Sequence, residues 1–218
     1  DVVADNATDT LTLVAGSNMT ITTNATSDTI TFAASSGTGV SIDSYRNTFA
    51  GTDTGISLTV NSTDNTFFGY NAGRIVNSGD KNTLIGAYAG DTISTGNNNT
   101  AVGQEALQNS NGSDNVAIGK GAGYNATTGN KNTFVGENAG YTSNGSNSTC
   151  LGQNAGANGT NNHAIAIGDR SLWLGGTNTV AIGQNTLTRG AQTGSIGIGY
   201  YAGCLLYTSD AADDFDCV

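Results

Sequence analysis

A nine-residue motif of the type Asn-Thr-x-(Ile/Val)-Gly-x-x-Ala-Gly recurs along most of the chain, and this repetition limits the fold more than any other feature. Its anchor glycine, which follows a large apolar residue, returns every 15 to 17 residues, and a weaker copy, Asn47–Gly51, precedes the series. A unit this short cannot bury its own apolar side, so the repetition predicts a stack of short coils that cover one another. The anchors, which we expect to form tight corners, are Gly69, Gly86, Gly103, Gly119, Gly136, Gly152, Gly168, Gly183 and Gly199.

The three residues before each anchor have the character of a short β-strand. The residue directly before the anchor is always large and apolar, and the residue two positions earlier is Thr or another β-branched residue. Because strand side chains alternate, these two positions share one face. We expect that face to line the interior, so that stacked copies about 4.7–4.9 Å apart form an aliphatic core ladder. The predicted ladder is Phe68, Ile85, Val102, Ile118, Val135, Leu151, Ile167, Ile182 and Ile198.

The residue between those two positions faces the other way, yet it also avoids charge. It is large in Phe67, Leu84 and Phe134, and Ala, Cys or Gly in the other copies. A strand with a solvated outer face should alternate apolar and polar residues. The pattern therefore predicts a covered outer face, with another copy of the same chain as the cover. Small residues at an exposed position carry little meaning by themselves, and this alternative stays open for the Ala and Cys copies.

The composition agrees with a turn-rich β-fold. The chain contains 32 Gly and no Pro, and its filler residues are Asn, Thr and Ser, which favour turns and short strands. Charged residues make up only 11%, against roughly 25% in a typical soluble domain. The expected fold is all-β, a parallel β-roll or solenoid of about nine to ten short coils over residues 47–203.

The two ends of the chain differ from the repeats. Residues 1–46 carry alternating runs such as Met19–Thr22 and Thr29–Phe32, which predict a short β-meander. In residues 204–218, Cys204–Asp213 matches one reading frame of a sequencing-library adapter, so we expect a non-native tail translated from a truncated metagenomic read. Because the chain does not begin with Met, we expect it to be a fragment of a longer protein.

Several repeats carry a family resemblance. The segments Asn82–Gly90 and Asn115–Gly123 resemble the head repeats of trimeric autotransporter adhesins and, more closely, related repeats of phage tail-fibre proteins. The repeat is longer here than is usual in the adhesins, which favours the fibre group. The resemblance covers roughly residues 47–203, and Ala15–Ile21 is similar to fibre shaft segments. It implies a left-handed β-roll, a homotrimer and a place in the virion tail; the alternative is an adhesin head on a bacterial cell surface.

The sequence contains no pattern that predicts an enzyme, a cofactor or a metal site. His163 is the only histidine, no glycine-rich run ends in Gly-Lys-Ser/Thr, and the carboxylates lack calcium-loop spacing. Cys150, Cys204 and Cys217 fit neither a disulfide framework nor a zinc site. With a net charge of −10 and seven basic residues, we expect no nucleic-acid surface. Without an apolar run of roughly 18 residues, we expect no membrane insertion.

The function that fits these features is a structural and host-attachment segment of a fibre, which binds copies of itself and a host glycan or protein. Tyrosines near the corners are candidate receptor contacts because they can stack on sugars, namely Tyr88, Tyr124 and Tyr141. The alternative is that these rings pack across coils or chains. A function of another class, binding to ice or another ordered surface, would use the Thr column that contains Thr83, but Val116 interrupts this column.

Overall fold

The chain forms two units, which divide between Gly39 and Val40. In the first unit, β1 (Met19–Asn24) and β2 (Thr29–Ala34) pair as antiparallel strands. The predicted tail, residues 204–218, lies outside the described residues. The computed structural model describes residues 19–24, 29–34, 41–59, 62–188 and 193–203.

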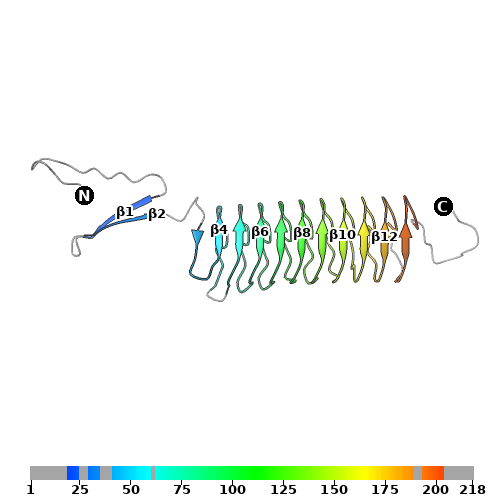
Figure 1. Cartoon of the computed structure of the whole chain (residues 1–218), viewed down its shortest axis with the longest axis horizontal. Coiled ribbons are helices and arrows are strands. Elements are labelled where there is room, and N and C mark those ends of the chain that lie inside the picture. The colour runs from blue at the N-terminus through cyan, green and yellow to red at the C-terminus, as the bar shows by residue number, and fades with distance from the viewer. Residues whose placement is uncertain (1–18, 25–28, 35–40, 60–61, 189–192, 204–218) are drawn as a thin grey trace, which may run out of the picture. The chain divides into compact units, whose positions relative to one another are not determined.

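The second unit is a stack of short coils, each of which adds one strand to a single 11-stranded sheet (Figure 1). From β4 to β13, neighbours in sequence pair in parallel, whereas β3 pairs antiparallel with β4. The prediction of an all-β parallel solenoid is confirmed, and the described residues contain no helix. The strands are β3 (Ser41–Ile42), β4 (Thr48–Ala50), β5 (Thr66–Phe68), β6 (Thr83–Ile85), β7 (Thr100–Val102), β8 (Val116–Ile118), β9 (Thr133–Val135), β10 (Thr149–Leu151), β11 (Ile165–Ile167), β12 (Val180–Ile182) and β13 (Ile196–Ile198).

The anchor glycines turn the chain directly after each strand, with φ between +120° and +138°. L side chains rarely adopt this conformation. A Cβ on Gly86 would also lie 2.5 Å from the carbonyl oxygen of Gly103 in the next coil. Glycine at this position therefore permits both the corner and the close approach of successive coils.

The interior of the stack is lined by the middle residue of each strand, not by the residue before the anchor. Phe67, Leu84 and Phe134 are completely buried, whereas Ile85 is 39% and Ile118 43% exposed. The prediction of an aliphatic core ladder is therefore wrong: all its members lie on the outward face, and none is buried. This correction applies to Phe68, Ile85, Val102, Ile118, Val135, Leu151, Ile167, Ile182 and Ile198.

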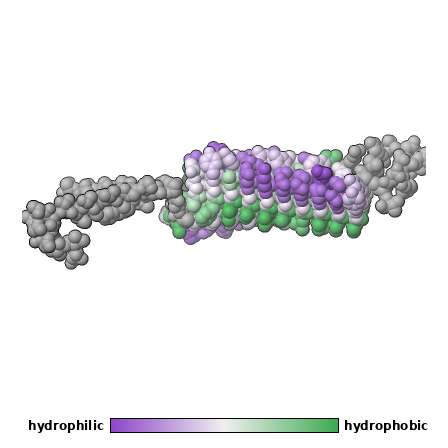
Figure 2. Space-filling view, turned by 90° about the horizontal axis from the view of Figure 1, so that it is seen from above, coloured by the Kyte–Doolittle hydropathy of each residue, from purple (hydrophilic) through white to green (hydrophobic). Residues whose placement is uncertain are grey.

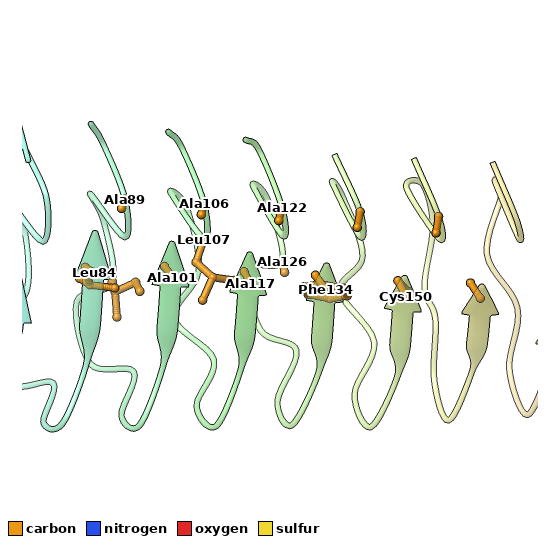
Figure 3. Packing of buried hydrophobic residues seen from close by; sticks show 14 of the residues in the cluster. Leu84, Ala89, Ala101, Ala106, Leu107, Ala117, Ala122, Ala126, Phe134 and Cys150 are labelled. Carbon is orange, nitrogen blue, oxygen red and sulfur yellow. The ribbon is translucent and has the colours of Figure 1, made fainter. Parts of the chain in front are cut away.

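The physical reason for the error is that strand alternation cannot tell inside from outside when both faces are apolar. What selects the middle column is the narrow interior, where the middle residue and the residue six positions later share one volume. A Cβ on Gly90 would lie 2.7 Å from both Cδ atoms of Leu84. Where the middle residue is Ala101, the later position carries the buried Leu107 instead, which projects into the stack in Figure 3.

The same exchange of size recurs along the stack. Large or polarisable middle residues pair with glycine, and alanines pair with leucine. The exceptions are Ala117 with Gly123 and Gly197 with Gly203. In the first, Leu107 and Phe134 of the adjacent coils fill the space, because a Cβ on Gly123 would lie 2.7 and 2.8 Å from their Cδ2 atoms. In the second, Leu187 of the preceding coil fills it, because a Cβ on Gly203 would lie 2.5 Å from its Cδ2 atom. The pairs that follow the rule are Phe67 with Gly73, Leu84 with Gly90, Ala101 with Leu107, Phe134 with Gly140, Cys150 with Gly156, Ala166 with Leu172 and Ala181 with Leu187.

A buried column of asparagines runs beside the interior and fixes the register of the coils. The Oδ1 atom of Asn82 accepts hydrogen bonds from the backbone N–H (3.0 Å) and Nδ2 (3.1 Å) of Asn99 in the next coil. The Nδ2 atom of Asn82 donates to the Gly96 carbonyl at 2.9 Å. These bonds satisfy polar groups that water cannot reach. The column consists of Asn47, Asn65, Asn82, Asn99, Asn115 and Asn132.

Candidate interaction surfaces

The outward face of the sheet is the first candidate surface, because it is apolar along the stack. It consists of the first and third residues of strands β4 to β13, and none of these residues is buried. The third residue is apolar in every strand, and the first changes from mostly Thr to Ile or Val from β11 onward. Figure 2 shows a continuous hydrophobic stripe along the stack. Parallel sheets occur almost only with both faces covered, so this face is unusual for a solvent-exposed surface.

A second surface, which we call the corner face, is formed by the second and fifth residues after each anchor glycine. Two of the candidate receptor contacts lie here as a pair, because Tyr124 and Tyr141 stack with centroids 4.8 Å apart and ring planes 5° apart. Tyr88 packs edge-on against Tyr70 at 5.2 Å. Burial raises the pKa of Tyr141, and hydrogen bonding with Tyr70 raises that of Tyr88. All three candidates are half-buried and pack across coils within this chain.

Ion pairs tie successive coils together near the N-terminal end of the stack. Arg46 binds Asp64 through two hydrogen bonds of 2.6 and 2.8 Å. Arg74 also binds its partner, Asp91, in a bidentate manner, through hydrogen bonds of 2.7 and 3.2 Å. The Asp91 side chain is almost completely buried. These arginines therefore serve the stack itself rather than an outside ligand.

A hollow near the C-terminal end of the stack is the surface feature that the sequence did not predict. It is open to solvent, has a volume of about 500 Å³ and draws its walls from three successive coils. A signal was present, because the single Trp of the chain occupies a repeat position that is Ala157 and Thr188 in the adjacent coils. The residues that line the hollow are Arg170, Trp173, Leu174, Asn185, Thr188 and Tyr201.

Reactive chemistry has few candidates in the part of the chain that the structure describes. Cys150 lies in the interior, and burial raises the pKa of its thiol to about 12, so the nucleophilic thiolate is suppressed. Within the described residues, no group of three or more His, Cys, Asp and Glu side chains is placed to hold a metal ion. Across the same residues, no helix is long and apolar enough to cross a bilayer.

Similarity to known proteins adds nothing to the assignment of a function, which therefore rests on these surfaces. No protein-family model, no curated protein and no solved structure matches the chain.

Proposed function

We propose that this chain is a structural and host-attachment segment of a trimeric fibre, of the phage tail-fibre type. The observation that carries the proposal is the apolar outward face of an otherwise complete parallel sheet. Monomeric soluble proteins rarely expose contiguous apolar patches larger than a few hundred Å². A stripe that follows the stack for about 40 Å therefore indicates a surface that is covered in the working assembly.

A second copy of the chain is the cover that matches this stripe best. The outward residues repeat once per coil, and a partner whose side chains repeat at the same spacing can interdigitate with them along the whole length. Another copy of the chain has that spacing because it is built from the same coils. Cyclic assembly around an axis parallel to the stack, on the side of the stripe, would then bury the stripes of all copies together.

Attachment to a host is assigned to the surfaces that such an assembly would leave free. The corner face carries the stacked pair Tyr124 and Tyr141, and aromatic rings with a polar tip suit a glycan or protein receptor. This arrangement would serve an adhesin head on a bacterial surface equally well. The length of the repeat favours the virion tail.

The mass of the full chain in solution tests the assembly. Sedimentation equilibrium should give three times the 21.9 kDa of one chain. A monomer with an intact far-ultraviolet β-sheet spectrum would contradict the proposal, because the apolar face would then be stable in water.

A charge placed on the stripe provides a sharper test. Ile118→Asp puts a carboxylate on the outward face without entering the coil interior, so the coils should still stack while the assembly falls to a monomer. Thr95→Asp is the matched control, because Thr95 lies exposed on a turn away from the sheet and its variant should keep the wild-type mass. If Ile118→Asp also keeps the wild-type mass, the outward face is not the interface.

Binding to an ordered surface such as ice is the alternative of another class. One observation favours it: the Thr column, including Thr66, Thr83 and Thr100, faces outward. The column is interrupted by Val116 and gives way to Ile165, which suits protein packing better than a regular hydroxyl array. Measurable thermal hysteresis of the purified chain would favour this alternative.

A further inference from the structure

The hollow near the C-terminal end of the corner face is held in place by the coil register. Arg170, Asn185 and Tyr201 occupy the same repeat position in three successive coils. The backbone N–H of Asn185 donates to the Asp169 carbonyl at 2.9 Å, and that of Tyr201 donates to the Gln184 carbonyl at 3.0 Å. The side chains around the hollow therefore project from a hydrogen-bonded frame. Its volume of about 500 Å³ lies within the roughly 300–1,000 Å³ that is typical of small-ligand sites.

The lining combines flat apolar surfaces with polar groups at the rim. Trp173, Leu174 and Tyr201 supply the apolar part, and Leu174 and Tyr201 are exposed to solvent. Asn185 and Thr188 supply hydrogen-bond donors and acceptors. A pyranose ring is complementary to this lining, because one face of the ring presents C–H groups and its edge presents hydroxyls. An open hollow with an indole wall therefore fits a sugar better than it fits a wholly apolar ligand.

Trp173 differs from the tyrosines near the corners because it has no ring partner among the described residues. The tyrosines Tyr70 and Tyr88 pack together, as do Tyr124 and Tyr141, whereas no aromatic contact to Trp173 occurs among the described residues. Its indole face is therefore not used by the packing of another ring. A ligand can pack there without displacing one.

Arg170 adds a charge to the rim and narrows the ligand class. Among the described residues, Arg46 and Arg74 are bound by Asp64 and Asp91, and Arg170 is the arginine without an ion pair. The planar guanidinium matches a carboxylate through two parallel hydrogen bonds. In a chain of net charge −10, an arginine left free at the rim of a hollow favours an anionic group on the ligand.

We propose that this hollow binds an acidic sugar, with the C–H face of the sugar ring on Trp173 and its carboxylate on Arg170. The inference names a receptor class for the host-attachment role and rests on that proposed function. It places the contact at Trp173 rather than at the stacked Tyr124 and Tyr141. A host glycan that ends in a uronic or a sialic acid has the required chemistry.

The single tryptophan makes the test direct, because its fluorescence reports only on this site. The full chain is titrated with methyl glucuronide and with sialyllactose, and with the neutral methyl glucoside and lactose at the same ionic strength. We expect a saturable fluorescence change with at least one acidic sugar and a much weaker response to its neutral counterpart. No saturable change with either acidic sugar, or equal responses to acidic and neutral sugars, overturns the proposal.

Two variants tie the binding to the residues. Arg170→Gln should weaken the acidic sugar roughly tenfold or more, whereas Lys131→Gln, which removes an exposed positive charge elsewhere, should leave it unchanged. Trp173→Ala should abolish saturation transfer from the protein to the sugar ring protons in ligand-observed NMR. Equal losses for the Arg170 and Lys131 variants would show that binding follows net charge and would overturn the site.

The mass of the same samples keeps this proposal separate from that of the fibre. A trimer that binds no acidic sugar overturns the hollow as a site and leaves the fibre standing. A monomer that binds the acidic sugar through Trp173 supports the hollow and contradicts the fibre.

Discussion

Two interior positions of each coil share one volume, and this rule explains the residues that look irregular in the repeat. The position six residues after the middle of the strand has a positive φ, which normally favours glycine, yet it is Leu172 in one coil with φ +54°. Leucine fits at this position because the small side chain of its partner, Ala166, leaves room for it in the interior. Burying the leucine side chain offsets the strain of the backbone.

An exchange of the two side chains tests the shared volume. Ala166→Leu alone should overpack the interior and destabilise the chain by about 1–3 kcal/mol, and Leu172→Gly alone should leave a cavity that costs about 2–5 kcal/mol. The double variant restores the arrangement of Leu84 and Gly90, so it should lose clearly less than the sum of the two. Urea unfolding of the four proteins measures the coupling, and simple additivity would contradict a shared volume.

The interior cysteine makes stability depend on pH at the alkaline end. Burial raises the pKa of Cys150 from 9.0 to about 12, so the folded state holds the thiol proton more tightly than the unfolded state does. The resulting stabilisation is fully present below pH 9.0 and is lost as the pH rises from there toward about 12.

We predict that Cys150→Ala removes this contribution. Between about pH 9 and 11, the free energy of unfolding should fall more steeply for the wild type than for the variant. The control variant is Cys204→Ser, which replaces a cysteine of the predicted tail instead of Cys150. Identical pH slopes for the wild type and Cys150→Ala would contradict the burial of the thiol.

At the residue scale, the sequence also predicted only part of the structure. The columns of the repeat, the corner glycines and the strand positions follow from spacing alone. The choice of which strand face points inward does not, because Ile85 and Leu84 are equally apolar and a three-residue strand offers no longer pattern. The size exchange between Leu84 and Gly90 contained that information, but it becomes meaningful only once the two positions are known to touch.

At the scale of one strand and its turn, the buried asparagine before each of the strands β4 to β9 holds neighbouring elements in register. Asn99 links the coils on both sides of it. Its backbone N–H donates to the Asn82 Oδ1 of the preceding coil at 3.0 Å. In the following coil, its Nδ2 donates to the Gly112 carbonyl at 2.9 Å, and its Oδ1 accepts from the Asn115 N–H at 3.0 Å. Further along, the same position is Ser148, whose hydroxyl accepts from the Ala164 N–H at 3.1 Å. Ser148 therefore continues the column with a donor and an acceptor, whereas the buried Ala164 before β11 ends it.

Removal of one member of this column should be costly although no apolar contact is lost. Asn99→Ala leaves the Gly112 carbonyl and the Asn115 N–H buried without their partners, at about 1–3 kcal/mol for each group. Asn77→Ala, on an exposed turn, should change the free energy of unfolding by less than about 0.5 kcal/mol. Equal effects of the two variants in urea unfolding would refute the structural role of the column.

The candidate surfaces show the same limit of prediction at the scale of elements. An apolar outer face was predicted, although from the opposite column of the strand, because both columns avoid charge. The hollow at Trp173 was not predicted, since its walls come from three coils that carry different residues at equivalent positions. Aligning the repeats places Arg170, Asn185 and Tyr201 in one column, but only the stacked geometry shows that the space beside them is empty.

At the scale of the whole stack, each strand from β4 to β12 pairs only with the strands before and after it among the described residues, so the unit behaves as a one-dimensional array. Its stability is then close to a sum over coils and their interfaces. Removal of one complete coil should be tolerated where the two new neighbours have the chemistry of the old ones. The coil of Ala166 and Leu172 meets this condition. It follows the coil of Cys150 and Gly156, and the coil after it again carries alanine and leucine at the two interior positions.

Deletion of Ala164–Asn178 should therefore give a folded, shorter stack. The coil of Cys150 would meet that of Ala181 and Leu187 with the interior volumes matched, and the far-ultraviolet spectrum per residue should be unchanged with only a modest fall in Tm. Deletion of Ala164–Ser171, about half a coil, is the contrasting variant. It shifts every later column out of alignment, so the C-terminal coils should lose their β-sheet signal and become sensitive to protease. If the half-coil deletion is as stable as the full-coil deletion, register is not what holds the stack together.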